Sequence, residues 1–228
     1  MTEFVFAPPA QPALPVAGEA ALFPVRRIFC VGRNYAEHIR ELGNDTREPP
    51  FFFTKPADAL VVGDARIPFP PATADLHHEA ELVVAIGRGG QDIPAGAALE
   101  HVWGYAPGND LTRRDLQAQA KSMRRPWDMA KAFDNSAPCG ALRPVSEVGH
   151  PAAGRITAHV NGELRQSGDL SEMIWPVADI IAHLSALVAL APGDLIYTGT
   201  PAGVGALSRG DCCRVEIEGL GAVTTEIA

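Results

Sequence analysis

The sequence lacks both a cluster of basic residues and a long apolar run, and each absence excludes a class of protein. Its 228 residues carry 19 basic and 27 acidic side chains, a net charge of −8. The longest basic cluster is the pair Arg124 and Arg125, which is too short to hold nucleic acid through its phosphates. The apolar stretch 180–190 is interrupted by His183 and Ser185 and is too short to span a bilayer. We therefore expect neither nucleic acid nor a membrane as a partner.

Cysteine is also scarce, and its spacing fits no metal-binding motif. None of the four cysteines forms a C-x-x-C pair, which a zinc site of the common type would need. The N-terminal residues include an acidic residue and are soon followed by prolines, unlike a secretory signal. Scattered thiols without such a signal are typical of a reducing compartment, so we expect a cytoplasmic protein.

Several familiar catalytic motifs are missing. His78 and Glu79 begin the H-E-x-x-H pattern of zinc proteases, but Leu82 stands at its fifth position. No G-x-S-x-G elbow is present, so an α/β-hydrolase serine mechanism lacks its nucleophile. The glycine-rich loop 199–205 has neither the Gly-Lys-Ser/Thr of a P-loop nor the spacing of a dinucleotide fold. It is typical either of a plain turn or of a loop that offers backbone N–H groups to an anion.

The elements that the sequence predicts are mainly strands. Twenty prolines and 22 glycines favour turns and strands over a helix bundle. We expect a proline-rich extended arm over residues 1–24, a single β-rich α+β domain over 25–228, and a hairpin at Asn161-Gly162. A short helix after Asn34 should end near Gly43. The remaining expected elements are strands at 25–31, 51–55, 79–86, 101–106, 194–198, 213–217 and 222–227, a helix at 111–122 capped by Asp110, and a helix at 177–190.

The most informative stretch is the predicted acidic strand. Side chains alternate faces along a strand, so Glu79 and Glu81 point the same way. Two carboxylates on one face repel each other, and burying them is costly unless a cation compensates. Asp110 follows another apolar run, and three hard oxygen donors suit Mg²⁺ or Mn²⁺. The alternative is an exposed strand whose acids face water.

Two further groups of residues are candidates for chemistry. His38 and Glu41 are three residues apart on the expected helix and would meet on one face. The carboxylate would orient the imidazole as a general base that activates water, unless the two form an ordinary surface pair. Arg114 and Gln117 share a helix face with Asp110 and would reach a ligand there, or simply meet solvent.

Lys131 and Thr200 complete the candidates. Lys131 interrupts a short apolar run, where it would stabilise an oxyanion or, as the ordinary alternative, extend its ammonium to the surface. Thr200 lies in the glycine-rich loop and offers a hydroxyl to an anionic ligand.

Taken in order, these residues resemble the fumarylacetoacetate hydrolase family. The resemblance covers about residue 25 to the C-terminus. Segments 131–138 and 166–175 resemble, more narrowly, the acylpyruvate hydrolases that cleave fumarylpyruvate. The matching residues are Gly32-Arg33-Asn34-Tyr35, His38, Glu41, Glu79, Glu81, Asp110, Arg114, Gln117, Lys131 and the loop 199–205.

The resemblance implies a mixed β-roll or sandwich-like fold with a few short helices, and a homodimer. It implies Mg²⁺ or Mn²⁺ on Glu79, Glu81 and Asp110, and a small acylpyruvate as substrate. Water activated by His38 and Glu41 would attack that substrate and break a C–C bond. Relatives with the same triad also decarboxylate oxaloacetate or isomerise diketo acids, so these reactions stay open. A binding module stabilised by a metal is the alternative that is not an enzyme.

Overall fold

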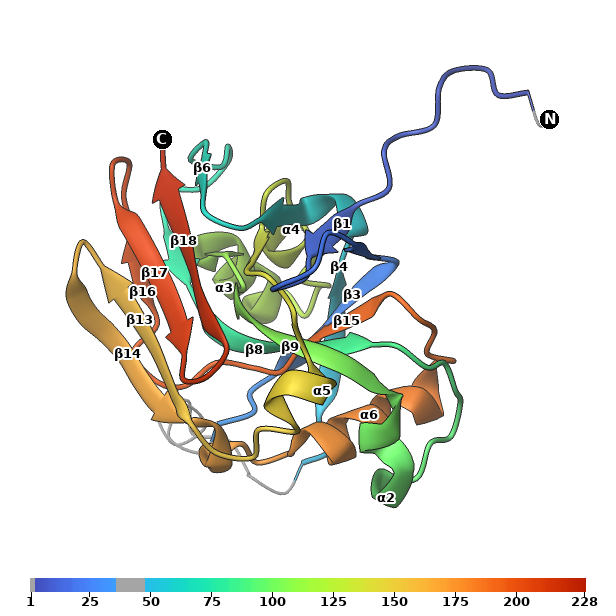
Figure 1. The fold of residues 1–228 in the computed structure, drawn as a ribbon. Coiled ribbons are helices and arrows are strands. Elements are labelled where there is room, and N and C mark those ends of the chain that lie inside the picture. Colours follow the sequence, from blue (N-terminus) through green and yellow to red (C-terminus); the bar gives the residue numbers. More distant parts are fainter. Residues whose placement is uncertain (1–2, 36–47) are drawn as a thin grey trace.

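The computed structural model describes residues 3–35 and 48–228, and strands dominate it (Figure 1). The largest sheet has the order β4-β3-β15-β8-β9-β11-β5, with β12 pairing to β9. Strand β15 runs parallel to β3 and antiparallel to β8, so the sheet is mixed. Its strands are β3 (Arg27–Gly32), β4 (Phe51–Lys55), β5 (Leu60–Val62), β8 (Ala80–Ile86), β9 (Val102–Asn109), β11 (Ala137–Cys139), β12 (Arg143–Pro144) and β15 (Asp194–Tyr197).

A second sheet of five strands packs beside the first and carries most of the C-terminal chain (Figure 1). Its order is β14 (Glu163–Asp169), β13 (Arg155–Val160), β17 (Cys212–Ile217), β18 (Gly221–Ile227) and β6 (Ala65–Ile67). Two smaller sheets join β10 (Thr112–Arg113), β7 (Leu76–His78) and β16 (Gly205–Leu207), and β1 (Ala13–Pro15) and β2 (Leu22–Pro24).

The described helices are short, and none of them is both long and apolar enough to cross a membrane. The longest, α6 (Val177–Leu187), begins after Pro176 as expected and buries Ile180 and Leu184. The others are α2 (Ala95–Ala98), α3 (Arg114–Ser122), α4 (Asp128–Lys131), α5 (Val145–Val148) and the 3₁₀ turns η1 (Ala57–Ala59), η2 (Leu99–His101) and η3 (Leu170–Glu172).

Strand β8 lies between two apolar clusters, so neither of its faces meets solvent. Leu82 and Val84 pack into the cluster shared with the five-stranded sheet and α6, whereas Val83 and Ala85 pack into the cluster on the other side. Because faces alternate along a strand, Glu81 shares the face of Val83 and Ala85. A carboxylate is therefore carried into the interior by a strand whose burial is fixed by its apolar residues.

The fold class expected from the sequence is confirmed: the structure is β-rich, with curled sheets and a few short helices. The hairpin turns at Asn161 and Gly162, which have φ of 54° and 84°. Such positive φ angles at both central residues are those of the type I′ turn that this dipeptide favours.

Two local expectations are wrong. Asp110 does not cap the helix, because the chain first forms β10 and α3 begins only at Arg114. Residues 13–24 do not form an extended arm, because β1 and β2 pair as a hairpin whose Leu14 and Phe23 are buried. The helix expected after Asn34 lies outside the described residues.

Candidate metal centre and active-site cavity

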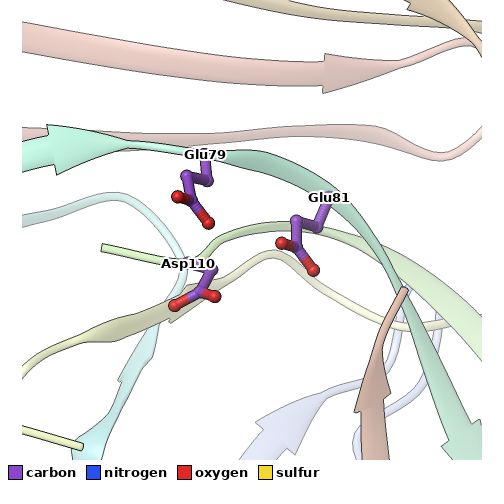
Figure 2. A group of neighbouring side chains, drawn as sticks. All are labelled: Glu79, Glu81 and Asp110. Atoms are coloured by element: carbon purple, nitrogen blue, oxygen red, sulfur yellow. The ribbon is translucent and has the colours of Figure 1, made fainter. Parts of the chain in front are cut away.

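Three buried carboxylates converge where β8 and β9 meet (Figure 2). Glu81 belongs to β8, Glu79 stands between β7 and β8, and Asp110 directly follows β9. Antiparallel pairing brings them together, because Glu81 lies opposite Gly108 and the Asp110 N–H donates to the Glu79 carbonyl at 2.9 Å. One oxygen from each carboxylate lies within 4.8 Å of the others. The three acids expected to act together thus form one cluster.

Two buried lysines neutralise part of this cluster. Lys131, the last residue of α4, donates to Glu79 Oε2 and Asp110 Oδ2, both at 2.7 Å. Burial lowers the pKa of Lys131, but Asp110 and Glu79 outweigh burial, so the pKa is raised and the ammonium stays charged. Lys55, at the end of β4, places Nζ 2.8 Å from Asp110 Oδ1 and donates to the carbonyls of Leu111 and Lys131. Lys131 is therefore an interior residue and not one that extends to the surface.

Arg114 and Gln117 lie on one side of α3 and reach the same cluster. Arg114 Nη2 donates to Glu79 Oε1 at 2.5 Å, and Nη1 donates to Gln117 Oε1 at 2.7 Å. Burial opposes ionisation of Glu79, but Lys131 and Arg114 outweigh it and hold the pKa of Glu79 below its usual range. The guanidinium is thus already paired with a protein carboxylate, and it binds Gln117 through the amide oxygen, not the amide nitrogen.

Glu81 is the carboxylate that the protein compensates least. Among residues 3–35 and 48–228, its recorded hydrogen bond comes from the Gly199 N–H, at 2.8 Å from Oε2. Burial, and then the charges of Asp110 and Glu79, raise the pKa of Glu81 well above its ordinary value. Gly199 has a φ of +97°, and a Cβ there would lie 2.7 Å from Asn34 Cβ. Only glycine therefore lets this loop bring its N–H to Glu81.

This donor set fits a hard divalent cation. Asp110 Oδ1 is buried and has no directed hydrogen bond within the described chain, although Lys55 lies close to it. Asp110, Glu79 and the poorly compensated Glu81 each place a carboxylate oxygen within 4.8 Å of the others, close enough to share one cation. Mg²⁺ and Mn²⁺ prefer such ligands and complete their coordination with water or substrate. Glu79, Glu81 and Asp110 are the residues that would hold the cation.

Gln166 of β14 ties the glycine-rich loop to β8. Its Oε1 accepts from the Ala80 N–H at 3.0 Å, so its Nε2 must be the group that donates to Thr200 Oγ1 at 2.8 Å. His78 Nδ1 lies 2.9 Å from the same Oε1 and must therefore carry a proton. Since Thr200 Oγ1 accepts from Gln166, its own hydroxyl proton can be donated elsewhere.

A cavity of about 270 Å³ opens beside the carboxylates. Charged and aromatic side chains line it together, and Thr200 is also part of the lining. The lining includes Arg33, Phe51, Phe53, Glu79, Glu81, Arg114, Gln117, Lys121, Trp127, Lys131 and Thr200. The predicted residues that the structure describes thus line this cavity, except Asp110, which is fully buried and contacts the lining residue Lys131. His38 and Glu41 lie outside the described residues.

Two contributors were not among the candidates: Lys55 comes from the end of a strand, and Gln166 acts through the loop that it holds. The glycine-rich loop was expected to offer backbone N–H groups to an anionic ligand, and Gly199 donates its N–H to the carboxylate of Glu81. Nothing in the sequence around Lys55 and Pro56 indicates that this lysine is buried. The segment containing Gln166 did attract notice through its resemblance to acylpyruvate hydrolases, but the residue itself did not.

A fold of this kind with a buried acidic cluster defines a known class of protein, and the chain belongs to it: residues 27–228 match the family described as fumarylacetoacetate (FAA) hydrolase, C-terminal. The family assignment expected from the sequence is thereby confirmed.

Proteins similar to this chain are named for several different activities. A fumarylpyruvate hydrolase from Pseudomonas aeruginosa, crystallised with Mn²⁺ and pyruvate, is 51% identical with a TM-score of 0.97 and covers 99% of both chains. The mitochondrial oxaloacetate tautomerase FAHD1 of Rattus norvegicus is 42% identical over 86% of this chain and 88% of its own. A mitochondrial oxaloacetate decarboxylase of Dictyostelium discoideum is 39% identical over 86% and 90%. The chain is therefore similar over nearly its full length to enzymes that act on small oxo acids.

Proposed function

We propose that this protein hydrolyses a C–C bond in a 2,4-diketo acid, with fumarylpyruvate as the substrate and fumarate and pyruvate as the products. The observation that carries the proposal is a cavity lined by Glu79, Glu81 and the charged Lys131, which also pairs with the buried Asp110. The similarity of the whole chain to a fumarylpyruvate hydrolase that binds Mn²⁺ and pyruvate supports this choice of substrate. We further propose a cytoplasmic homodimer in which residues 25–228 form the catalytic domain.

A divalent cation on Glu79, Glu81 and Asp110 would act as a Lewis acid that polarises the 2-oxo group and stabilises negative charge as it develops. The protein's own residues position the substrate around it. Gln117 and Thr200 offer an amide N–H and a hydroxyl to the carboxylate and the 2-oxo oxygen. Arg114 fixes the carboxylate of Glu79 and the amide of Gln117 and so sets the direction of both.

The proposed hydrolysis begins with a proton transfer from water to His38, which Glu41 orients. The hydroxide adds to C4, and the C3–C4 bond breaks, leaving fumarate and the enolate of pyruvate. A proton returns to C3 to give pyruvate. Lys131 has three N–H groups, of which two are used by Glu79 and Asp110. The third would donate to the oxyanion that forms at C4.

Decarboxylation or tautomerisation of oxaloacetate is the second candidate. It is favoured by the relatives named for those activities, which cover 86% of this chain. Loss of CO₂ also yields an enolate, but it needs no activated water. The two candidates therefore share the carboxylate cluster and differ in their need for an activated water.

The decisive experiment compares fumarylpyruvate, acetylpyruvate and oxaloacetate as substrates, before and after treatment with a chelator. Hydrolysis is followed by loss of the enol absorbance, and decarboxylation by CO₂ release. We expect acylpyruvate cleavage that disappears with chelator and returns with Mn²⁺. Turnover of oxaloacetate without acylpyruvate cleavage would replace the proposal with the second candidate.

His38→Ala separates the two reactions within one protein. If His38 is the base, hydrolysis should fall by about 10²- to 10⁴-fold, the range for losing general base catalysis. Any decarboxylation should fall much less. Both rates are measured at matched Mn²⁺ occupancy. The control is His159→Ala, which replaces a histidine in β13 of the five-stranded sheet. Acylpyruvate cleavage within a few-fold of wild type would show that another group activates water.

A further inference from the structure

The outer part of the cavity holds two cations that the proposed reaction does not use. Arg33 directly follows β3 and Lys121 lies on α3, and both line the cavity. Lys121 Nζ lies 4.9 Å from the centre of the Trp127 ring, and Arg33 Cζ lies 5.7 Å from the centre of the Phe51 ring. Each cation thus rests against an aromatic side chain of the cavity wall.

Neither cation has a carboxylate within salt-bridge distance among residues 3–35 and 48–228. Arg33 Nε is buried and has no hydrogen-bond partner there. Burial, and then the positive charges of Arg114 and Arg33, lower the pKa of Lys121. Both cations line the same cavity and repel each other, and a bound anion would relieve that repulsion.

The backbone holds Arg33 in place at some cost. Its φ is +58°, a conformation that costs a residue with a side chain of order 1 kcal/mol or more. A Cβ on the preceding Gly32 would overlap the Phe51 ring. The turn is thus built so that the chain passes close to Phe51 and directs the next residue to the cavity.

The cations nearest the carboxylate cluster already form ion pairs with it. Arg114 pairs with Glu79, and Lys131 pairs with Glu79 and Asp110. Aromatic rings connect this inner end to the outer cations. Lys131 Nζ lies 5.0 Å from the Phe53 ring centre, and the Phe53 ring centre lies 5.9 Å from that of Trp127.

We propose that Arg33 and Lys121 bind a second carboxylate at the far end of the substrate, so that the site selects dianionic 2,4-diketo acids with a flat, unsaturated chain. The flat chain would lie along the aromatic wall. This inference rests on the proposed function, because it takes the first end of the substrate to be held at the metal centre. Losing one charge-assisted hydrogen bond should weaken binding by about 10- to 100-fold.

The first test is calorimetry in the presence of Mn²⁺ with 2-oxoheptanedioate and 2-oxoheptanoate, which differ only in the distal carboxylate. Wild type should bind the dianion at least ten-fold more tightly. Lys121→Gln and Arg33→Asn should each remove most of that difference, since asparagine tolerates the left-handed backbone. Lys121→Arg should retain it. Arg124→Gln, which removes the same charge from an exposed position after α3, should retain it as well.

The second test is kcat/KM for fumarylpyruvate and for acetylpyruvate, which lacks the distal carboxylate. Both variants should lose about 10- to 100-fold on fumarylpyruvate and at least five-fold less on acetylpyruvate. Equal losses on both, or no preference of wild type for the dianion in calorimetry, would overturn the second carboxylate site. A protein that keeps the calorimetric preference but cleaves no acylpyruvate would overturn the proposed function and leave this site standing.

Discussion

Replacing Glu81 with glutamine should weaken metal binding while leaving the metal-free fold at least as stable as it was. Glu81 is buried beside two other carboxylates and accepts a hydrogen bond from the Gly199 N–H. Burial and those neighbouring charges raise its pKa, which means that its ionised form is disfavoured in the folded protein. Glutamine keeps an oxygen for Gly199 and carries no charge, so the repulsion falls.

The size of the effect follows from ligand linkage. A cation present at 100 times its Kd stabilises the folded protein by about 2.7 kcal/mol. If loss of one carboxylate ligand raises Kd about 100-fold, the gain at the same concentration falls to about 0.4 kcal/mol. For a chain of this size, each kcal/mol moves Tm by about 2–4 °C. Mn²⁺ should therefore raise Tm by about 5–11 °C in wild type and by about 1–2 °C in the variant.

The assay is thermal unfolding of chelator-treated protein, with and without a fixed Mn²⁺ concentration. Glu163→Gln is the matched control, because its side chain is 74% exposed and it removes the same charge. An undiminished Mn²⁺ shift in Glu81→Gln would show that Glu81 is not a ligand. A loss of more than about 2 kcal/mol in the metal-free variant would show instead that its charge stabilises the fold, contrary to the electrostatic reasoning.

Two further variants test how the cluster is held. Lys131→Met leaves Glu79 and Asp110 with one less buried cation. The free energy of unfolding of the metal-free protein, measured in urea, should therefore fall by about 3–5 kcal/mol, and Mn²⁺ should restore part of it. An unchanged urea midpoint would contradict the pairing. Gly199→Ala places a Cβ 2.7 Å from Asn34 Cβ at a φ of +97°, so it should cost about 1–3 kcal/mol and weaken Mn²⁺ binding in calorimetry. Binding and stability equal to wild type would mean that the loop does not depend on glycine.

The acidic cluster was predictable because a strand has a simple period. Two glutamates two residues apart must share a face, and the apolar residues that follow bury that face. The register between β8 and β9 was not predictable in this way. It is fixed by the antiparallel ladder that sets Ala80 opposite Asn109, which places Asp110 next to Glu79. The sequence therefore indicated the three carboxylates, and the strand pairing shows why they meet.

Lys55 and Gln166 were missed because their contacts are distant in sequence. Lys55 donates to carbonyls 56 and 76 residues away, and Gln166 accepts from a backbone N–H 86 residues away. Local patterns describe which face of an element is buried, but not which distant element covers that face. A buried lysine at a strand end therefore has the same local appearance as an exposed one.

The N-terminal hairpin was missed for a different reason. Proline cannot donate to a ladder, and a proline-rich segment is usually read as irregular. In a two-stranded ribbon both strands are edges, where proline is tolerated. Pro15 pairs with Leu22, and Pro24 pairs with Ala13, so both prolines stand at the ends of the ribbon. The buried side chains Leu14 and Phe23 lie between them.

The balance of charge around the cluster indicates where selectivity must arise. Three buried carboxylates face Lys55, Lys131 and Arg114, so the site is close to neutral before a divalent cation binds. The cation adds positive charge that an anionic substrate can offset, and more so as an enolate develops. Hydrolysis of a diketo acid and decarboxylation of oxaloacetate both pass through an enolate, so this inner cluster serves either reaction equally. Under the proposed function, the choice between them would depend on groups outside the cluster: a base that activates water, and the two cations that we propose bind the far end of the substrate.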